Sequence, residues 1–121
     1  MSSDIYSIVI AALEDIKGQD LVTIDVRELS DITDTMVVVS GASNRQVKAL
    51  AQNTVEEGKK AGFQPIGVEG MEEGEWVLVD FGDVIVHVMQ VKTRAFYELE
   101  KLWSLRPSDA TKIDVDVDEN G

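Results

Sequence analysis

The sequence contains no cysteine and only one histidine, and both scarcities exclude whole classes of chemistry. Without cysteine there is no disulfide framework, no thiol nucleophile and no cysteine-based zinc site. The single histidine, His87, cannot form a histidine cluster for a metal. Long apolar runs are also missing, so no segment is expected to span a bilayer. No basic region precedes the first apolar stretch, which argues against a signal or transit peptide, and we expect a cytoplasmic protein.

Basic residues are the next scarcity. The chain has 11 Lys and Arg residues against 23 Asp and Glu residues, which gives a formal net charge of −12. The four acidic residues in 113–121 account for 4 of these charges, so residues 1–112 still carry −8. A chain with this charge repels phosphate backbones and attracts basic protein surfaces. We therefore expect no direct nucleic-acid readout, and a basic protein is the more compatible partner.

The 121 residues, 44% of them hydrophobic, are enough for one domain with a real core. Helical spacing of apolar residues predicts helices over about 5–16, 43–61 and 93–105. Short β-branched and apolar runs predict strands at 21–26, 36–40, 63–68, 76–80 and 84–89. The order α-β-β-α-β-β-β-α predicts an α/β (mixed α+β) fold, with a single five-stranded mixed sheet packed by three helices.

The connections between these elements carry further expectations. The strand–helix–strand unit over 36–68 is a crossover, so its two strands are expected to be parallel neighbours. Phe81-Gly82-Asp83 is typical of a hairpin turn, and Pro65 indicates a short or edge strand. We expect one domain over residues 1–106 and an acidic tail, predicted to be disordered, over 107–121.

Two motifs suggest an enzyme. Ser40-Gly41-Ala42-Ser43 precedes a helix, where free amide groups favour phosphate, and Asp80 and Asp83 follow as candidate metal ligands. Two carboxylates that share a metal on one strand face need spacing i, i+2, whereas these are three apart across a turn. A nucleotidyltransferase-like enzyme acting on nucleoside triphosphates is therefore the alternative hypothesis. Our main expectation is a non-enzyme with no cofactor and no metal.

His87 lies between two valines of a predicted strand, with Asp80, Asp83 and Glu100 as candidate partners. No nucleophile accompanies it, so the pattern gives little support to catalysis. A buried or half-buried histidine that makes one hydrogen bond is the commoner arrangement, and a contact residue in an interface is the alternative.

Exposed Trp, Tyr and Arg side chains are enriched among binding anchors, and Trp76, Arg94 and Tyr97 are candidates for such a patch. Arg94 lies one turn before Tyr97, and Trp76 begins a strand directly after an acidic loop. Simple packing explains these residues equally well from physics alone. Trp103 continues the apolar stripe of the last predicted helix, which favours a role in the core.

Four sequence blocks follow one another between about residues 5 and 104. They contain Ser40-Gly41-Ala42-Ser43, Val68-Glu69-Gly70, Trp76-Val77-Leu78-Val79-Asp80-Phe81-Gly82-Asp83, and Tyr97-Glu98-Leu99-Glu100. Together they resemble the ribosomal silencing factor family, also called the Iojap-like family. The resemblance implies a fold similar to that of nucleotidyltransferases, without their catalytic carboxylates. It also implies a translational repressor, which binds the large ribosomal subunit through that subunit's ribosomal protein number fourteen and sterically blocks joining with the small subunit.

The resemblance carries residue roles as well. The family positions that we favour for partner binding are Trp76, Asp80, His87, Arg94, Tyr97 and Glu100. The positions that we favour as structural are Gly41, Gly70, Gly82 and Trp103. The chain differs from many members at Lys92, where they carry an acid, and at Thr35-Met36, where they carry an aromatic pair. An exposed edge strand near Pro65 would in addition allow a homodimer off the ribosome.

Overall fold

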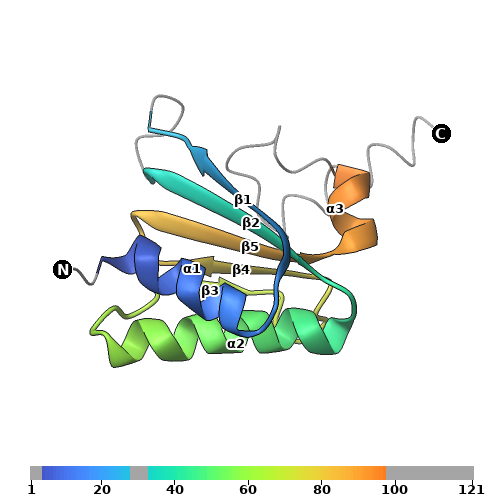
Figure 1. Ribbon diagram of the computed structural model, residues 1–121, viewed down its shortest axis with the longest axis horizontal. Helices are drawn as coiled ribbons and strands as arrows, with labels where there is room; N and C mark the ends of the chain where they lie inside the picture. The colour runs from blue at the N-terminus through green and yellow to red at the C-terminus, as the bar shows by residue number, and fades with distance from the viewer. Residues whose placement is uncertain (1–3, 28–32, 98–121) are drawn as a thin grey trace.

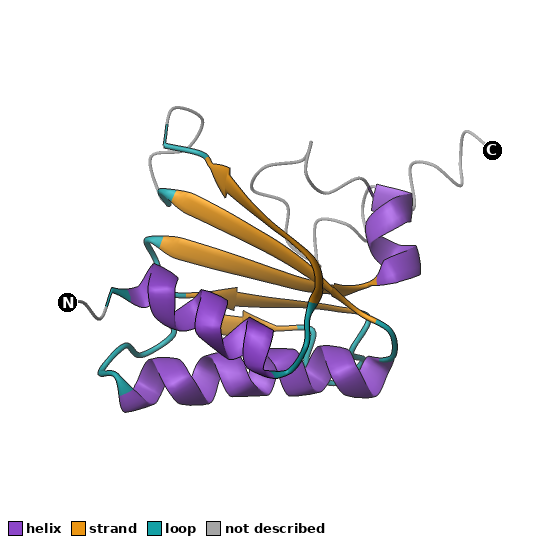
Figure 2. Ribbon diagram, viewed as in Figure 1, coloured by secondary structure: helices purple, strands orange, loops and turns teal. Residues whose placement is uncertain are grey.

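The computed structural model describes residues 4–27 and 33–97, which form one five-stranded mixed sheet with two helices across one face (Figure 1). The helices on that face are α1 (Ile5–Asp15) and α2 (Asn44–Lys60), and a short helix α3 (Val91–Tyr97) continues directly from the last strand (Figure 2). The strands are β1 (Gln19–Asp25), β2 (Thr35–Gly41), β3 (Gly67–Glu69), β4 (Trp76–Asp80) and β5 (Val84–Gln90). The predicted fold class is confirmed.

The strand order in the sheet is β1-β2-β5-β4-β3. β2 runs parallel to β5, and the other three neighbouring pairs are antiparallel. The prediction that the strands flanking α2 are parallel neighbours is wrong: β3 runs in the direction of β2, but β5 and β4 lie between them. Every residue of β4 and β5 is buried, so this hairpin takes the centre of the sheet and leaves the edge to β3.

The strand predicted at 63–68 is much shorter than expected. β3 begins only at Gly67, after Pro65, which has no N–H for a strand ladder, and it pairs with three residues of β4. The hairpin between β4 and β5 forms as predicted. Phe81 donates its N–H to the Val84 carbonyl at 2.9 Å, and Gly82 takes a φ of 92°, which side-chain-bearing residues rarely adopt.

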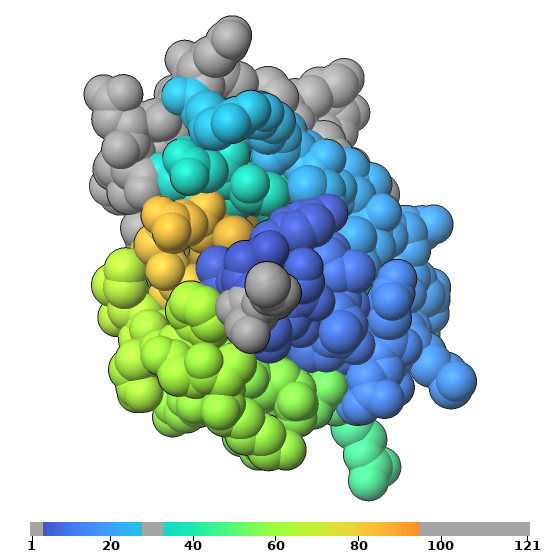
Figure 3. Space-filling model, turned by 60° about the vertical axis from the view of Figure 1, so that its left-hand side comes forward, coloured from blue at the N-terminus to red at the C-terminus, as the bar shows by residue number. Residues whose placement is uncertain are grey.

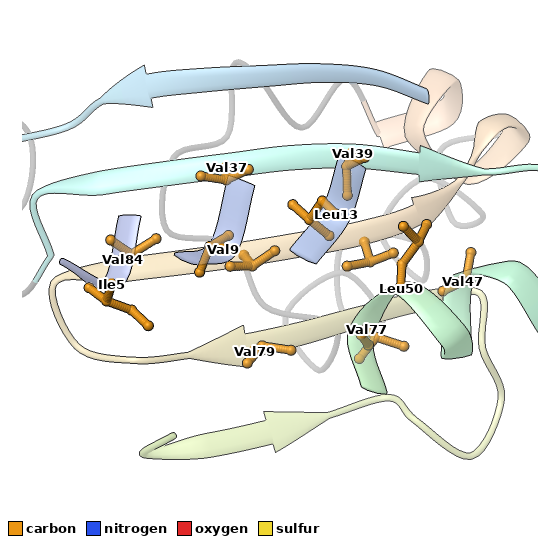
Figure 4. Packing of buried hydrophobic residues seen from close by; sticks show 13 residues of the cluster. Ile5, Val9, Leu13, Val37, Val39, Val47, Leu50, Val77, Val79 and Val84 are labelled. Carbon is orange, nitrogen blue, oxygen red and sulfur yellow. The ribbon is translucent and has the colours of Figure 1, made fainter. Parts of the chain in front are cut away.

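The main core lies between the sheet and the two helices (Figure 4). α1 contributes Val9 and Leu13 and α2 contributes Leu50, and these pack against alternate valines of the sheet. The valines are Val37, Val39, Val77, Val79, Val84, Val86 and Val88. Full burial of one such side chain contributes about 1.5–3 kcal/mol. The side chains between these valines point to the other face of the sheet, which explains why apolar residues stand at consecutive positions in Met36–Val39 of β2 and Val84–Val86 of β5.

α1 and α2 lie side by side, as the space-filling view from the end where α1 begins also shows (Figure 3). Asn53 joins them, because its Nδ2 donates to the Ala12 carbonyl at 2.9 Å. A cavity of about 350 Å³ opens between the two helices, with Asp15 and Glu57 at its lining. Among residues 4–27 and 33–97, no helix is long and apolar enough to cross a membrane.

Candidate partner-binding site

Three of the residues predicted to bind a partner lie on the sheet face opposite α1 and α2, which we call the second face. Trp76 and Asp80 belong to β4 and His87 to β5, and their side chains alternate with the core valines. Trp76 and Asp80 are each 6% exposed and His87 is 1% exposed. In this structure these three side chains support the second face by packing, and they expose little area to a partner. Their role as direct contacts stays a prediction.

Trp76 and His87 form a hydrogen-bonded pair on the second face. The indole Nε1–H of Trp76 donates to Nδ1 of His87 at 2.9 Å, and the ring centroids are 5.8 Å apart. In the β4–β5 register Leu78 stands opposite His87, so Trp76 is the diagonal neighbour of the imidazole. Long side chains reach each other across such a diagonal. The histidine is therefore buried, and the Trp76 indole is one of its hydrogen-bond partners.

Asp80 ends β4 and fixes the turn that follows it. Its Oδ1 accepts the backbone N–H of Gly82 at 2.8 Å, which holds the hairpin in its left-handed turn. Asp83 comes after this turn and is exposed, whereas Asp80 is buried. Within the described part of the chain, no three Asp, Glu or His side chains gather in a way that could hold a metal ion.

Arg94 ties α3 to the end of the sheet. Its guanidinium donates to the Asp20 carbonyl at 2.6 Å and to Oγ of Ser40 at 3.0 Å, so one side chain joins α3, β1 and β2. Asp20 has a φ of 50° and lies where the β1–β2 register shifts. Sequence reasoning assigned Ser40 to a phosphate turn and missed this contact. A hydroxyl at the buried end of β2 indicates that a hydrogen-bond partner is needed, but it does not identify Arg94.

The remaining predicted contact residues lie farther along the chain. Tyr97 is the last residue of α3. Glu100 and Trp103 fall outside the described residues, as does the predicted acidic tail. Of the described positions, Arg94 and Tyr97 share α3, and Trp76, Asp80 and His87 share the second face.

Two of the glycines predicted to be structural sit where a side chain would collide. Gly70 has a φ of 86°, and a Cβ there would lie 2.1 Å from the Trp76 carbonyl oxygen. Gly41 ends β2, and a Cβ there would lie 3.0 Å from Cγ2 of Val47 on α2. The first position holds the loop that leads into β4 against the strand's own first residue, and the second brings α2 close to the sheet.

The turn considered as a phosphate site is occupied by the protein's own side chains. Ser43 caps α2, with its Oγ accepting the Gln46 N–H at 3.1 Å. Oε1 of Gln46 accepts the Ala42 N–H at 2.7 Å, and its Nε2 donates to the carbonyls of Ile16 and Lys17. A phosphate here would have to displace hydrogen bonds that the helix start already makes. The geometry therefore does not support the alternative enzymatic hypothesis.

A second polar cluster, not anticipated from the sequence, holds the acidic loop before β4. Asn44 donates from Nδ2 to the Glu73 carbonyl at 2.8 Å, and Gln90 donates from Nε2 to Oδ1 of Asn44. The Gln90 N–H also donates to the Glu75 carbonyl at 2.9 Å. The loop is thus fastened both to the start of α2 and to the end of β5, close to where Trp76 begins β4.

Shifted acid–base equilibria occur at the surface, away from the second face. Arg27 bonds Asp25, which lowers the pKa of that carboxyl and raises the pKa of the guanidinium. Glu57 raises the pKa of Lys60 in the same way. At the start of α1, the Ser7 N–H lowers the pKa of the Asp4 carboxyl that caps the helix. These shifts stabilise surface turns and helix ends and carry no catalytic chemistry.

Comparison with known proteins decides the family. The family model described as "Ribosomal silencing factor during starvation" matches residues 1–120. The chain belongs to this family. Ribosomal silencing factors regulate translation on the ribosome and form no known enzyme class, which agrees with the capped helix start and the separated carboxylates. The family resemblance drawn from the sequence blocks is confirmed.

Individual relatives agree with this membership. A ribosomal silencing factor from Chromobacterium violaceum is 50% identical over 100 residues, which are 83% of this chain and 82% of that protein. One from Bacillus subtilis is 37% identical over 116 residues, 96% of this chain and 95% of the relative. A crystal structure of a C. violaceum protein matches with a TM-score of 0.80 and 49% identity, covering 85% of this chain and 87% of that chain.

Proposed function

We propose that this ribosomal silencing factor represses translation by binding the large ribosomal subunit through that subunit's ribosomal protein number fourteen. Its bound body would then block joining with the small subunit by steric exclusion. The observation that carries the proposal is the family match over residues 1–120. Such a mechanism needs no bond making or breaking, because the free energy of binding one subunit competes directly with the free energy of subunit association. We place this activity in the cytoplasm.

The charge of the chain supports a protein rather than an RNA landing site. Residues 1–112 carry −8, so the rRNA backbone repels the body while a basic ribosomal protein attracts it. Attraction of this kind raises the rate of encounter, whereas specificity comes from a small desolvated centre. A domain with this net charge is therefore expected to bind an RNA-rich particle through one of its basic proteins.

We propose that α3 carries the surface that meets the partner, and that the buried second face supports this surface from within the sheet. Trp76, Asp80 and His87 would give this side its shape, because each is buried and each is hydrogen-bonded. Arg94 fixes α3 against β1 and β2, and Tyr97 is the last residue of this helix. Glu100 stays a predicted contact. The opposite side of the sheet is covered by α1 and α2.

The chain offers a matched pair of variants for this assignment, since it has two tyrosines. Tyr97→Ala is expected to weaken binding to purified large subunits by about 1–4 kcal/mol, the usual cost of losing an aromatic anchor. Tyr6 lies on α1 at the other side of the sheet, where its hydroxyl is hydrogen-bonded to Oγ1 of Thr23 at 3.0 Å. Tyr6→Ala should therefore leave binding unchanged. Co-sedimentation of each variant with large subunits gives both affinities.

Equal affinity of the two tyrosine variants would remove α3 from the proposed surface. Binding to naked ribosomal RNA, together with no binding to isolated ribosomal protein number fourteen, would overturn the choice of partner. Trp76→Ala is unsuitable for this purpose, because truncating a buried Trp costs about 3–5 kcal/mol of stability by itself.

The enzymatic alternative has a direct test in calorimetry with magnesium and nucleoside triphosphates. No heat of binding is expected at millimolar nucleotide, since Ser43 and Gln46 already occupy the amide groups at the start of α2. A saturable heat that is lost in a Ser43→Ala variant would revive the alternative.

A homodimer off the ribosome is a further proposal, which the edge of the sheet supports. β3 is an edge strand of three residues, and Ile66 just before it is 72% exposed. Pairing of two such edges would extend the sheet and cover this side chain. Light scattering over a concentration range should give a mass that rises towards twice 13.3 kDa, and a constant monomer mass would contradict the proposal.

A further inference from the structure

The hydrogen bond between Trp76 and His87 fixes the protonation state of the imidazole. An indole N–H can only donate, so Nδ1 of His87, 2.9 Å away, must present its lone pair. The neutral ring then carries its proton on Nε2. Protonation of Nδ1 would place two N–H donors against each other and break the bond. The orientation of Trp76 and the charge of His87 are therefore coupled by geometry.

This coupling sits inside the second face. Trp76 begins β4, where Gly70 packs against its carbonyl, and His87 occupies the middle of β5 between β2 and β4. Both rings are buried in close packing, so the indole cannot tilt without moving the side chains that surround it. Breaking the bond would disturb the strand start and the loop before it.

We propose that His87 is a positioning residue for Trp76, and that the second face is assembled for its partner only while the imidazole of His87 is neutral. The proposal rests on the proposed function, because it concerns the surface assigned there to the large subunit. It adds that binding weakens as His87 takes up a proton. The loss expected from one hydrogen bond between neutral groups is roughly 2- to 12-fold in affinity.

Among the described residues that share this sheet face with His87, some groups favour the charged imidazole and others the neutral one. Asp80 on β4 and Glu69 on β3 belong to the same sheet face, and their carboxylates favour an imidazolium. β2 brings only Met36, Val38 and Ser40 to this face, and Arg94 of α3 bonds Ser40 at its end. Burial and the Trp76 bond favour the neutral ring.

The first test uses the unaltered protein, because His87 is its single histidine. Nitrogen NMR of ¹⁵N-histidine-labelled protein should show, at pH 7.5, a lone pair on Nδ1 and a proton on Nε2. A proton on Nδ1 at this pH would overturn the proposal. This result does not depend on the ribosome, so it separates a failure of the positioning role from a failure of the proposed function.

The second test follows binding to purified large subunits between pH 5.5 and 8 beside the imidazole titration. The affinity should fall with the same midpoint as the ¹⁵N titration of His87. His87→Asn keeps an oxygen acceptor near Nδ1 and does not titrate, so its affinity should lack this step. The proposal is wrong if the two midpoints differ by more than about one pH unit, or if His87→Asn, shown to be folded by circular dichroism, retains the wild-type pH profile.

Discussion

Gln46 makes the clearest quantitative case for how the start of α2 is built. Its side chain makes three hydrogen bonds that join the turn after β2 to the end of α1, through Ala42, Ile16 and Lys17. The substitution Gln46→Ala removes all three and leaves the Ser43 cap in place. The expected result is a less stable protein with the same fold.

The size of the effect follows from the three distances. The bond from the Ala42 N–H is 2.7 Å, whereas those to the carbonyls of Ile16 and Lys17 are 3.3 and 3.2 Å. A net contribution of about 0.5–1.5 kcal/mol for each bond, with the two long ones at the low end, gives a loss of about 1.5–2.5 kcal/mol. Alanine has a higher helix propensity than glutamine, which offsets this loss of stability by a few tenths of a kcal/mol.

Gln52→Ala is the matched control, since Gln52 lies on the same helix, is exposed and bonds only Glu56 in the next turn at 2.8 Å. The helix-propensity gain is the same in both variants and cancels in the comparison. Urea unfolding followed by circular dichroism should give both variants the wild-type dependence of the free energy of unfolding on urea concentration. Gln52→Ala should lower the free energy of unfolding by less than about 0.5 kcal/mol. Gln46→Glu keeps the acceptor and loses both donors, so it should fall between wild type and Gln46→Ala. Equal stability of the two alanine variants would refute this account of the α2 start.

Two further perturbations test local geometry and charge. Gly70→Ala should cost at least about 2 kcal/mol in urea unfolding, because of its left-handed φ and the collision with the strand carbonyl, whereas Gly67→Ala meets no atom within 4 Å and should stay within about 1 kcal/mol. The pKa of the Asp4 carboxyl is lower in the folded protein, so its stabilisation is complete above the unfolded pKa and is lost as the pH falls through the folded one. Asp4→Asn, which still caps the helix, should show a smaller fall in melting temperature between about pH 5 and 2 than wild type, and an unchanged fall would contradict the assignment.

The helices and the hairpin could be predicted because their signals are local. The spacing that predicted helices at 5–16 and 43–61 reports which side chains share one helix face, and the observed helices end within one residue of those bounds. Gly82 marked the hairpin turn for the same reason. The strand order was not predictable in this way. No residue near β2 indicates that β5 is its parallel neighbour, because this pairing depends on the burial of the whole β4–β5 hairpin.

The candidate site shows the same division. Trp76, Asp80 and His87 were singled out by residue type and family position, but exposure depends on the sheet face, and the sequence alone did not show that all three are buried. The Trp76–His87 pair could have been predicted from the sequence. Once Gly82 is placed in the turn, counting outward along both strands puts Leu78 opposite His87 and Trp76 on its diagonal. The Arg94 contacts with β1 and β2 were not within reach, because they depend on a register shift in β1.

Subunit joining tests the central claim most directly. Purified large and small subunits, mixed at a magnesium concentration that favours association, increase light scattering as they join, and the protein is added to the large subunits beforehand. The account predicts that the amplitude falls as the protein saturates the large subunit and recovers when isolated ribosomal protein number fourteen is added as a competitor. Full joining with the protein still bound to the large subunit would contradict it.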